Sequence, residues 1–117
     1  MSPIDPRHFR NVLGHFPTGV TVVTGLDTDG IPLGITIGSF VSVSLEPPLV
    51  GFLPGRHSRS WPRIAGSGRF CVNILGAGQD ELCWRFAKEP AEGEPHKFSG
   101  IDWMPAPSGS PILPGNI

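Results

Sequence analysis

The sequence predicts a mainly β protein in which helices flank a small antiparallel barrel. Short runs of β-branched residues recur over residues 18–75, and such runs favour strands. The early runs are joined by tight turns, one with an Asp-Gly pair, that are too short for the crossovers of a parallel sheet. Stretches with helical spacing lie at the margins of these runs. This order of elements is typical of a small barrel with flanking helices.

The length and composition indicate one globular domain over residues 1–117. The formal net charge of −1 provides no overall attraction to nucleic acid or to an anionic membrane. The two cysteines, Cys71 and Cys83, are too few for a disulfide framework and indicate a reducing compartment. The N-terminus has no apolar leader, and no apolar run is long enough to span a bilayer. We therefore expect a cytoplasmic protein that binds neither nucleic acid nor membranes.

The first predicted helix covers residues 5–17. Asp5 suits the N-cap, Pro6 suits the first helical position, and Pro17 ends the run. Its apolar residues repeat at helical spacing and share one face: Phe9, Val12, Leu13 and Phe16. The sequence therefore predicts an amphipathic helix at this end of the chain.

Two further helices and a set of short strands complete the predicted elements. The helices cover residues 79–89 and residues 57–68, the latter begun by Ser58 or Ser60 and ended by Gly66 or Gly68. The strands cover residues 18–25, 34–45, 49–53 and 69–75. From Pro90 onward, proline and glycine recur every few residues, which predicts a loop, although another strand begins in residues 110–117.

Residues 34–45 form the most β-prone stretch, yet small and hydroxyl-bearing residues interrupt it, and we expect a bend near Ser39–Phe40. Gly34, Thr36 and Gly38 share one face of this strand. One interpretation is a sheet face open to solvent. The other is a surface where the backbone approaches a planar ligand, as glycine allows. The pattern alone leaves both open.

The turn at residues 53–60 collects basic and hydroxyl side chains at the start of a predicted helix: Arg56, His57, Ser58, Arg59 and Ser60. Free N–H groups at a helix N-terminus, together with guanidinium and hydroxyl groups, suit a phosphate. The alternative is a solvated basic turn with an ordinary serine cap. The sequence contains neither a P-loop nor a Gly-x-Gly-x-x-Gly fingerprint, which argues against a Rossmann nucleotide site.

No other cluster of residues predicts catalysis or metal binding. His8 and His15 are too far apart on their helix to share a metal ion. Cys71 and Cys83 lack a Cys-x-x-Cys partner, and the sequence has no Gly-x-Ser-x-Gly nucleophile elbow. We therefore expect no catalytic side chain and no metal ligand.

Five motifs follow one another along the chain: FRNVLGHFPTGVTVVT, GITIGSFVSVSLEPPLV, HSRSWPRI, GRFCVNIL and HKFSGIDW. In this order and at this spacing, from Asp5 to the last residue, they resemble the flavin reductase-like family of FMN-binding split barrels. The likeness is greatest to the small reductase components of two-component flavin monooxygenases.

The resemblance implies a fold, an activity and partners. The fold is an antiparallel split barrel with helices around it, and such proteins form homodimers with the flavin near the subunit interface. They transfer a hydride from NADH or NADPH to FMN or FAD and release the reduced flavin to a partner flavin-dependent monooxygenase. The flavin carries that chemistry, which agrees with the lack of an acid, base or nucleophile.

By position, the resemblance also implies the cofactor-binding residues. The isoalloxazine and the ribityl chain would lie along Pro32, Leu33, Gly34, Ile35, Thr36, Gly38 and Ser39. The phosphate would lie in the turn formed by Leu53, Pro54, Gly55, Arg56, His57, Ser58, Arg59 and Ser60, with Ser58 and Arg59 as its main contacts. Ala87 and Lys88 match a further flavin-contacting position.

Longer members of the family continue with strands that close the barrel and with a Gly-Asp-His stretch, whose histidine lies in the nicotinamide site. We expect this chain to be truncated before those strands, since neither His57 nor His96 matches that stretch. The alternative to a reductase is therefore a flavin-binding protein without reductase turnover. A third interpretation is a truncated chain with no function of its own.

Overall fold

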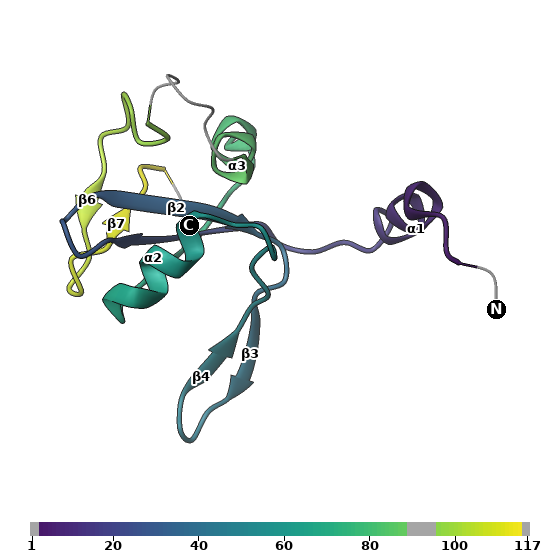
Figure 1. The fold of residues 1–117 in the computed structure, drawn as a ribbon, viewed down its shortest axis with the longest axis horizontal. Coiled ribbons are helices and arrows are strands. Elements are labelled where there is room, and N and C mark those ends of the chain that lie inside the picture. Colours follow the sequence, from purple (N-terminus) through teal and green to yellow (C-terminus); the bar gives the residue numbers. More distant parts are fainter. Residues whose placement is uncertain (1–2, 89–95, 116–117) are drawn as a thin grey trace.

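The computed structural model describes residues 3–88 and 96–115. The helices are α1 (Pro6–Leu13), α2 (Ser60–Ser67) and α3 (Asp80–Ala87). The strands are β1 (Thr21–Leu26), β2 (Pro32–Ile37), β3 (Val41–Ser44), β4 (Leu49–Gly51), β5 (Cys71–Ile74), β6 (Met104–Pro105) and β7 (Pro111–Ile112). Figure 1 shows their arrangement, which confirms the mainly β class with flanking helices.

A three-stranded antiparallel sheet in the order β2-β1-β5 forms the centre of the molecule. In Figure 1, α3 lies on one side of it and α2 on the other. Val22 packs with Phe86 of α3 on the first side, whereas Val23 packs with Trp61 of α2 on the second. The strands β3 and β4 form a separate hairpin, and so do β6 and β7. The closed barrel stays a prediction.

The strand predicted over residues 34–45 is two strands. β2 ends at Ile37, and β3 begins at Val41 and pairs with β4 rather than continuing the central sheet. The chain bends between them, where the sequence predicted it. There the Ser39 hydroxyl accepts a hydrogen bond of 2.9 Å from the N–H of Leu53, which ties the bend to the chain beyond β4. The prediction of one continuous strand was therefore wrong.

The small residues of β2 make room for α3. Gly34 is buried, and a methyl group added there would lie 2.7 Å from Cδ1 of Phe86. The Thr36 hydroxyl donates a hydrogen bond of 2.6 Å to the carbonyl of Cys83 in α3. The interpretation of this face as open to solvent was therefore wrong at Gly34, whereas Thr36 is half-buried and Gly38 is exposed.

The helix ends follow only some of the predicted caps. Asp5 caps α1 and accepts a hydrogen bond of 3.0 Å from the N–H of Arg7, but the helix ends before Gly14 and not at Pro17. At the start of α2 the N-cap is Arg59 rather than Ser58 or Ser60, and the hydroxyl of Ser58, one residue earlier, accepts from the N–H of Trp61 at 3.1 Å. Of the two predicted ends, Gly68 is the correct one, with a φ of 75°.

The C-terminal part of the chain is more than a loop. β6 and β7 form a hairpin there, which confirms a strand beginning near residue 110. Phe98 and Leu113 are buried with Val22 in the core. Asn73 of β5 holds this part to the sheet: its Nδ2 donates to the carbonyl of Pro111 and its Oδ1 accepts from the N–H of Leu113. The prediction of a plain loop was wrong, because burial of a few apolar side chains outweighs the many turn residues.

The turn between β1 and β2 is organised by Asp27. Its Oδ1 accepts from the N–H groups of Asp29 and Ile31 at 2.8 and 2.9 Å, and its Oδ2 accepts from Arg63 of α2. The bond from Ile31, followed by the bond from Arg63, holds the pKa of Asp27 below its ordinary value. The turn is therefore fastened to α2 by an ion pair.

Gly34→Ala is expected to lower the free energy of unfolding by about 1–3 kcal/mol, because the added methyl overpacks the buried Phe86 ring. Urea denaturation measures the change. As a control, Gly66→Ala inside α2 meets nothing within 4 Å and should instead stabilise the protein, by roughly 0.5–1 kcal/mol. A Gly34→Ala protein as stable as the wild type would contradict the packing of α3 against β2.

The Asp27 ion pair should also give a pH-dependent stability. Since the pKa of Asp27 is lowered on folding, its contribution is complete above the ordinary pKa of 3.8 and disappears as the pH falls below that value. Asp27→Asn should therefore lower the urea midpoint at about pH 6 and match the wild type towards about pH 2. Asp29→Asn removes a charge from the same turn without touching the ion pair, and its effect should lack this dependence. A deficit of Asp27→Asn that is constant with pH would refute this account.

Candidate functional site

Two neighbouring cavities lie beside β2. Cavity A, of about 220 Å³, is lined by Pro32, Leu33, Gly34, Arg59, Ser60, Arg63, His96 and Lys97. Cavity B, of about 400 Å³, is lined by Ile35, Thr36, Ile37, Gly55, Arg56, His57, Ser58, Phe86, Ala87 and Lys97. The first half of β2 thus faces the start of α2, and the second half faces the turn before it. The two cavities follow one another along the strand.

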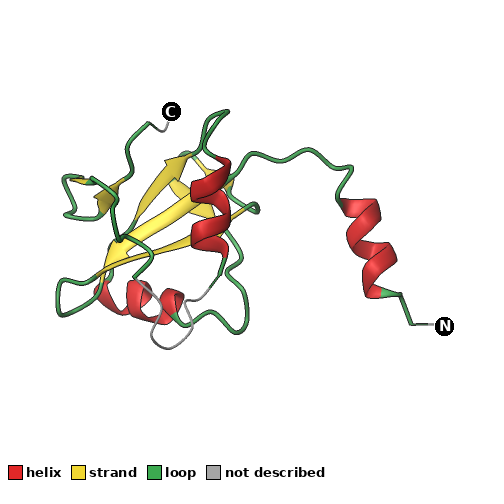
Figure 2. Ribbon diagram, turned by 90° about the horizontal axis from the view of Figure 1, so that it is seen from above, coloured by secondary structure: helices red, strands yellow, loops and turns green. Residues whose placement is uncertain are grey.

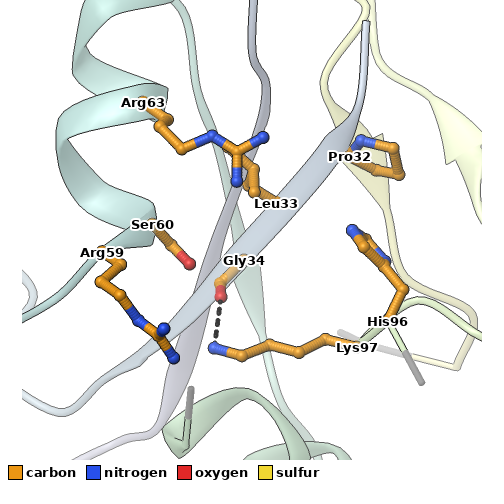
Figure 3. A pocket seen from close by; sticks show the side chains of 8 residues that line it. All are labelled: Pro32, Leu33, Gly34, Arg59, Ser60, Arg63, His96 and Lys97. Carbon is orange, nitrogen blue, oxygen red and sulfur yellow. Dashed lines mark hydrogen bonds between the residues drawn. The ribbon is translucent and has the colours of Figure 1, made fainter. Parts of the chain in front are cut away.

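Lys97 is shared by both cavities and was not predicted. It is only 9% exposed, and its Nζ donates hydrogen bonds of 3.2 Å to the carbonyls of Gly34 and Phe86. Figure 3 shows its side chain reaching across cavity A to Gly34. The residue belongs to the HKFSGIDW motif, which was the one signal in the sequence that marked this segment. Lys97 therefore places a positive charge between the cavities.

Cavity A is lined by cationic side chains from opposite sides. In Figure 3, Arg59, Ser60 and Arg63 project from the start of α2, and His96 and Lys97 come from the other side, with β2 between them. Arg63 also pairs with Asp27, which lies outside the lining. Among the residues that the structure describes, the lining has no carboxylate. This arrangement suits an anion.

Cavity B has an apolar wall and a basic end. The buried apolar residues Ile35, Ile37 and Phe86 line one side, and Arg56, His57 and Ser58 lie in the turn opposite. Its volume lies in the range of small-molecule sites, roughly 300–1,000 Å³. The combination suits a flat, largely apolar ligand that ends in an anionic group.

The structure brings most of the predicted cofactor-binding residues to these cavities. Cavity A collects Pro32, Leu33, Gly34, Arg59 and Ser60, and cavity B collects Ile35, Thr36, Gly55, Arg56, His57, Ser58 and Ala87. The remaining predicted residues line neither cavity: Gly38, Ser39, Leu53, Pro54 and Lys88. Ser39 and Leu53 instead bond to each other, and Lys88 is exposed just beyond α3. Arg63, His96 and Lys97 are lining residues that sequence reasoning missed.

The described residues offer little other chemistry. Within residues 3–88 and 96–115, no group of three or more His, Cys, Asp or Glu side chains is placed to bind a metal ion. Cys71 and Cys83 are unpaired and partly buried, and burial raises the pKa of each thiol. No helix in this part of the chain combines the length and apolar character needed to cross a membrane.

Comparison with known proteins gives close relatives. A reductase subunit of a flavin-dependent monooxygenase, HsaB, from Rhodococcus jostii is 54% identical over 97% of this chain and 56% of its own length. A flavin reductase from Pseudomonas putida is 52% identical over 99% of this chain and 66% of its own length. The chain therefore spans about 56–66% of the length of these relatives.

Solved structures resemble the fold as well. The homologue of nitrilotriacetate monooxygenase component B from Mycobacterium thermoresistibile superposes with a TM-score of 0.83 and 51% identity, over 94% of this chain and 59% of that one. The model of the flavin reductase like domain matches residues 13–117. A match over most of the chain, together with relatives of this identity, establishes descent: the protein belongs to the flavin reductase-like family.

Proposed function

We propose that this chain is the flavin-binding part of an NADH- or NADPH-dependent flavin reductase that supplies reduced FMN or FAD to a partner monooxygenase. The observation that carries this proposal is cavity B, in which an apolar wall faces a basic turn. Membership of the flavin reductase-like family points to the same ligand.

The residues of cavity B fit a flavin. The ring system would lie along Ile35, Thr36 and Ile37 of β2, close to Ala87 at the end of α3. The side chains of Ile35 and Ile37 are at most 6% exposed, so the ring would mainly meet the strand itself and the half-buried Thr36. The flavin phosphate would lie at Gly55–Ser58, where Arg56 supplies positive charge and the start of α2 adds the positive end of its dipole. Arg59 follows directly and lines the adjoining cavity A.

A bound flavin would accept a hydride from a reduced nicotinamide, which is chemistry that no side chain of this chain needs to perform. The role of the protein is to bind and orient the flavin. The basic turn fixes the phosphate end, the apolar wall excludes water from one side, and Lys97 keeps a positive charge at the end of the wall. The predicted site contains no catalytic acid or base, which agrees with chemistry carried by the flavin and binding carried by the protein.

The relatives support the choice of hydride donor and of partner. An FMN reductase (NADH) from Agrobacterium fabrum is 41% identical to this chain. An NADH:FAD oxidoreductase from Streptomyces globisporus is 38% identical. The HsaB relatives are reductase subunits of flavin-dependent monooxygenases. These names favour a reductase over the alternative, a flavin-binding protein without turnover.

We further propose that a second copy of the chain covers α1 and the β3–β4 hairpin, and that sheet and hairpins together build a split barrel. Figures 1 and 2 show α1 standing apart from the body of the molecule. Its apolar residues Phe9, Val12 and Leu13 are more than half exposed, and so are Phe16 just beyond the helix and Val41 and Val43 of the hairpin. An eight-residue helix is unstable alone in water, so it needs a partner surface.

The site of action that we propose is the cytoplasm. Cys71 and Cys83 are both free in the structure, and such thiols persist in a reducing compartment. Residues 1–117 would act there as one domain.

The test of reductase function is anaerobic mixing of the chain with FMN and NADH, compared with a protein-free control. Loss of the oxidised flavin absorbance should depend on the protein. Arg59→Ala should weaken FMN binding by roughly fivefold, because it removes one cation next to the phosphate turn. Fluorescence titration gives the dissociation constant.

Arg69→Ala is the matched control, because it removes the same charge beyond the opposite end of α2, outside both cavities. Its FMN affinity should equal that of the wild type. An unchanged affinity for Arg59→Ala would contradict the phosphate assignment. If flavin binds but its oxidised absorbance is not lost on addition of NADH, the chain is a flavin-binding protein without reductase turnover.

For the dimer, Val12→Glu should weaken self-association by roughly tenfold or more, because it buries a charge in the apolar interface. Sedimentation velocity over a range of protein concentrations measures the change. Asn11→Glu adds the same charge on the other side of α1 and should leave the dimer intact. A wild-type chain that stays monomeric at every concentration would overturn the proposal.

A further inference from the structure

A third cavity lies at the end of the molecule away from α1. This cavity C has a volume of about 380 Å³ and is lined by Leu26, Asp27, Thr28, Gly66, Ser67, Arg69, Ser108 and Ser110. Its walls are the end of β1 with the turn that follows, the end of α2, and the turn between β6 and β7 (Figure 1). None of these residues lines cavity A or cavity B. The volume lies in the range of small-molecule sites, roughly 300–1,000 Å³.

The hydrogen-bond acceptors around cavity C are already in use. The carboxylate of Asp27 accepts from two N–H groups of its own turn and from the ion-paired arginine of α2. At the end of α2, the carbonyl of Ile64 accepts from the Ser67 hydroxyl at 2.7 Å. The carbonyl of Ala65 accepts from the N–H of Gly68 at 3.1 Å. Because these groups are paired, Asp27 and the negative end of the α2 dipole offer the cavity little free negative charge.

The donors around cavity C are not used in the same way. Within residues 3–88 and 96–115, the guanidinium of Arg69 and the hydroxyl of Thr28 make no hydrogen bond or ion pair. The Ser108 hydroxyl accepts a hydrogen bond of 3.3 Å from the N–H of Ser110, and its own O–H has no acceptor in that part of the chain. The cavity therefore combines paired acceptors with unpaired donors, which suits an anionic ligand.

Ser110 is the most informative of these donors. The residue is only 2% exposed, and its hydroxyl has no hydrogen-bond partner among the described residues. Among those residues, no side-chain oxygen or nitrogen is both sealed from solvent and unpaired. The Ser110 hydroxyl therefore opens into cavity C, where its remaining exposure lies. A nearly buried hydroxyl without a protein partner is unfavourable, and a ligand at this place would satisfy it.

From these hydrogen bonds we propose that cavity C binds the phosphate group of a small molecule, with Arg69 and Ser110 as its main contacts. A phosphate has three strong acceptor oxygens, which match a planar guanidinium together with hydroxyl donors. A carboxylate has two oxygens and would leave some of the hydroxyls unused. Inorganic phosphate and a phosphate ester share this chemistry. The site lies outside both flavin cavities, so it does not rest on the proposed function.

The test follows the amide NMR signals of the FMN-saturated chain during titration with inorganic phosphate, glycerol 3-phosphate or acetate at constant ionic strength. FMN fills the phosphate turn of cavity B beforehand, so that the added phosphate does not compete there. The signals of Thr28, Arg69 and Ser110 should shift with phosphate until they saturate, and acetate should bind more weakly. Tighter binding of glycerol 3-phosphate than of phosphate supports an ester as the source, and equal binding supports free phosphate. Tighter binding of acetate than of either overturns the proposal.

Two variants remove the main contacts. Arg69→Gln should raise the phosphate dissociation constant by about fivefold or more, and Ser110→Ala should raise it by about threefold. Arg10→Gln is the matched control, because it removes the same charge from α1, which stands apart from the cavity. Its phosphate affinity should equal that of the wild type. Urea denaturation should show Ser110→Ala to be as stable as the wild type, because the lost hydroxyl has no partner among the described residues.

The remaining outcomes separate cavity C from the flavin site. Shifts that rise linearly with phosphate and are equal in all variants indicate an adventitious ion only, which overturns the proposal. A less stable Ser110→Ala protein means that the hydroxyl is bound within the protein, which also overturns it. Arg69→Gln should keep the FMN affinity of the wild type, so that failure of cavity C leaves the proposed function standing. If FMN does not bind at all, the proposed function is refuted, and the same titrations of the flavin-free chain decide cavity C.

Discussion

Both cavities depend on the contact between Phe86 and Gly34. A methyl group at residue 34 would lie 2.7 Å from the Phe86 ring, so only glycine lets α3 approach β2 this closely. Lys97 then donates hydrogen bonds to the carbonyls of Gly34 and Phe86, which satisfies a buried ammonium with two backbone acceptors. Because helix, strand and lysine are bound to one another in this way, the wall between cavity A and cavity B has a defined position.

The opposite edge of the core depends on a second polar contact. Asn73 donates to the carbonyls of Val22 and Pro111 and accepts from the N–H of Leu113, all in the buried interior. These bonds place the end of the chain against the central sheet, and Leu113 and Phe98 then complete the core beside Phe86. A buried amide with all of its partners specifies one arrangement more strictly than apolar packing alone. The segment that carries Lys97 is held between these two contacts.

Much of the fold was predictable where the information is local. The Asp5 cap and the bend near Ser39–Phe40 each depend on a few neighbouring residues. Most of the predicted cofactor-binding residues line a cavity, because the resemblance covered five motifs at once. The errors concern longer distances. The face of Gly34 and Thr36 was compatible with solvent or with a ligand, and no local pattern shows that α3 covers it. The C-terminal hairpin was missed because turn residues dominate its composition.

The sequence by itself determined the class of fold, the Asp5 cap and the basic turn, since these follow from residue types at short and regular spacing. Its five motifs carried the resemblance to the family. The tertiary structure alone decided which cavity each basic residue lines, and it added Arg63, His96 and Lys97 to the candidate site. Gly34 and Lys97 are 63 residues apart and still form a hydrogen bond. A contact of that kind arises from the packing of strand, helix and C-terminal segment together, and the spacing of residues within any one of them does not encode it.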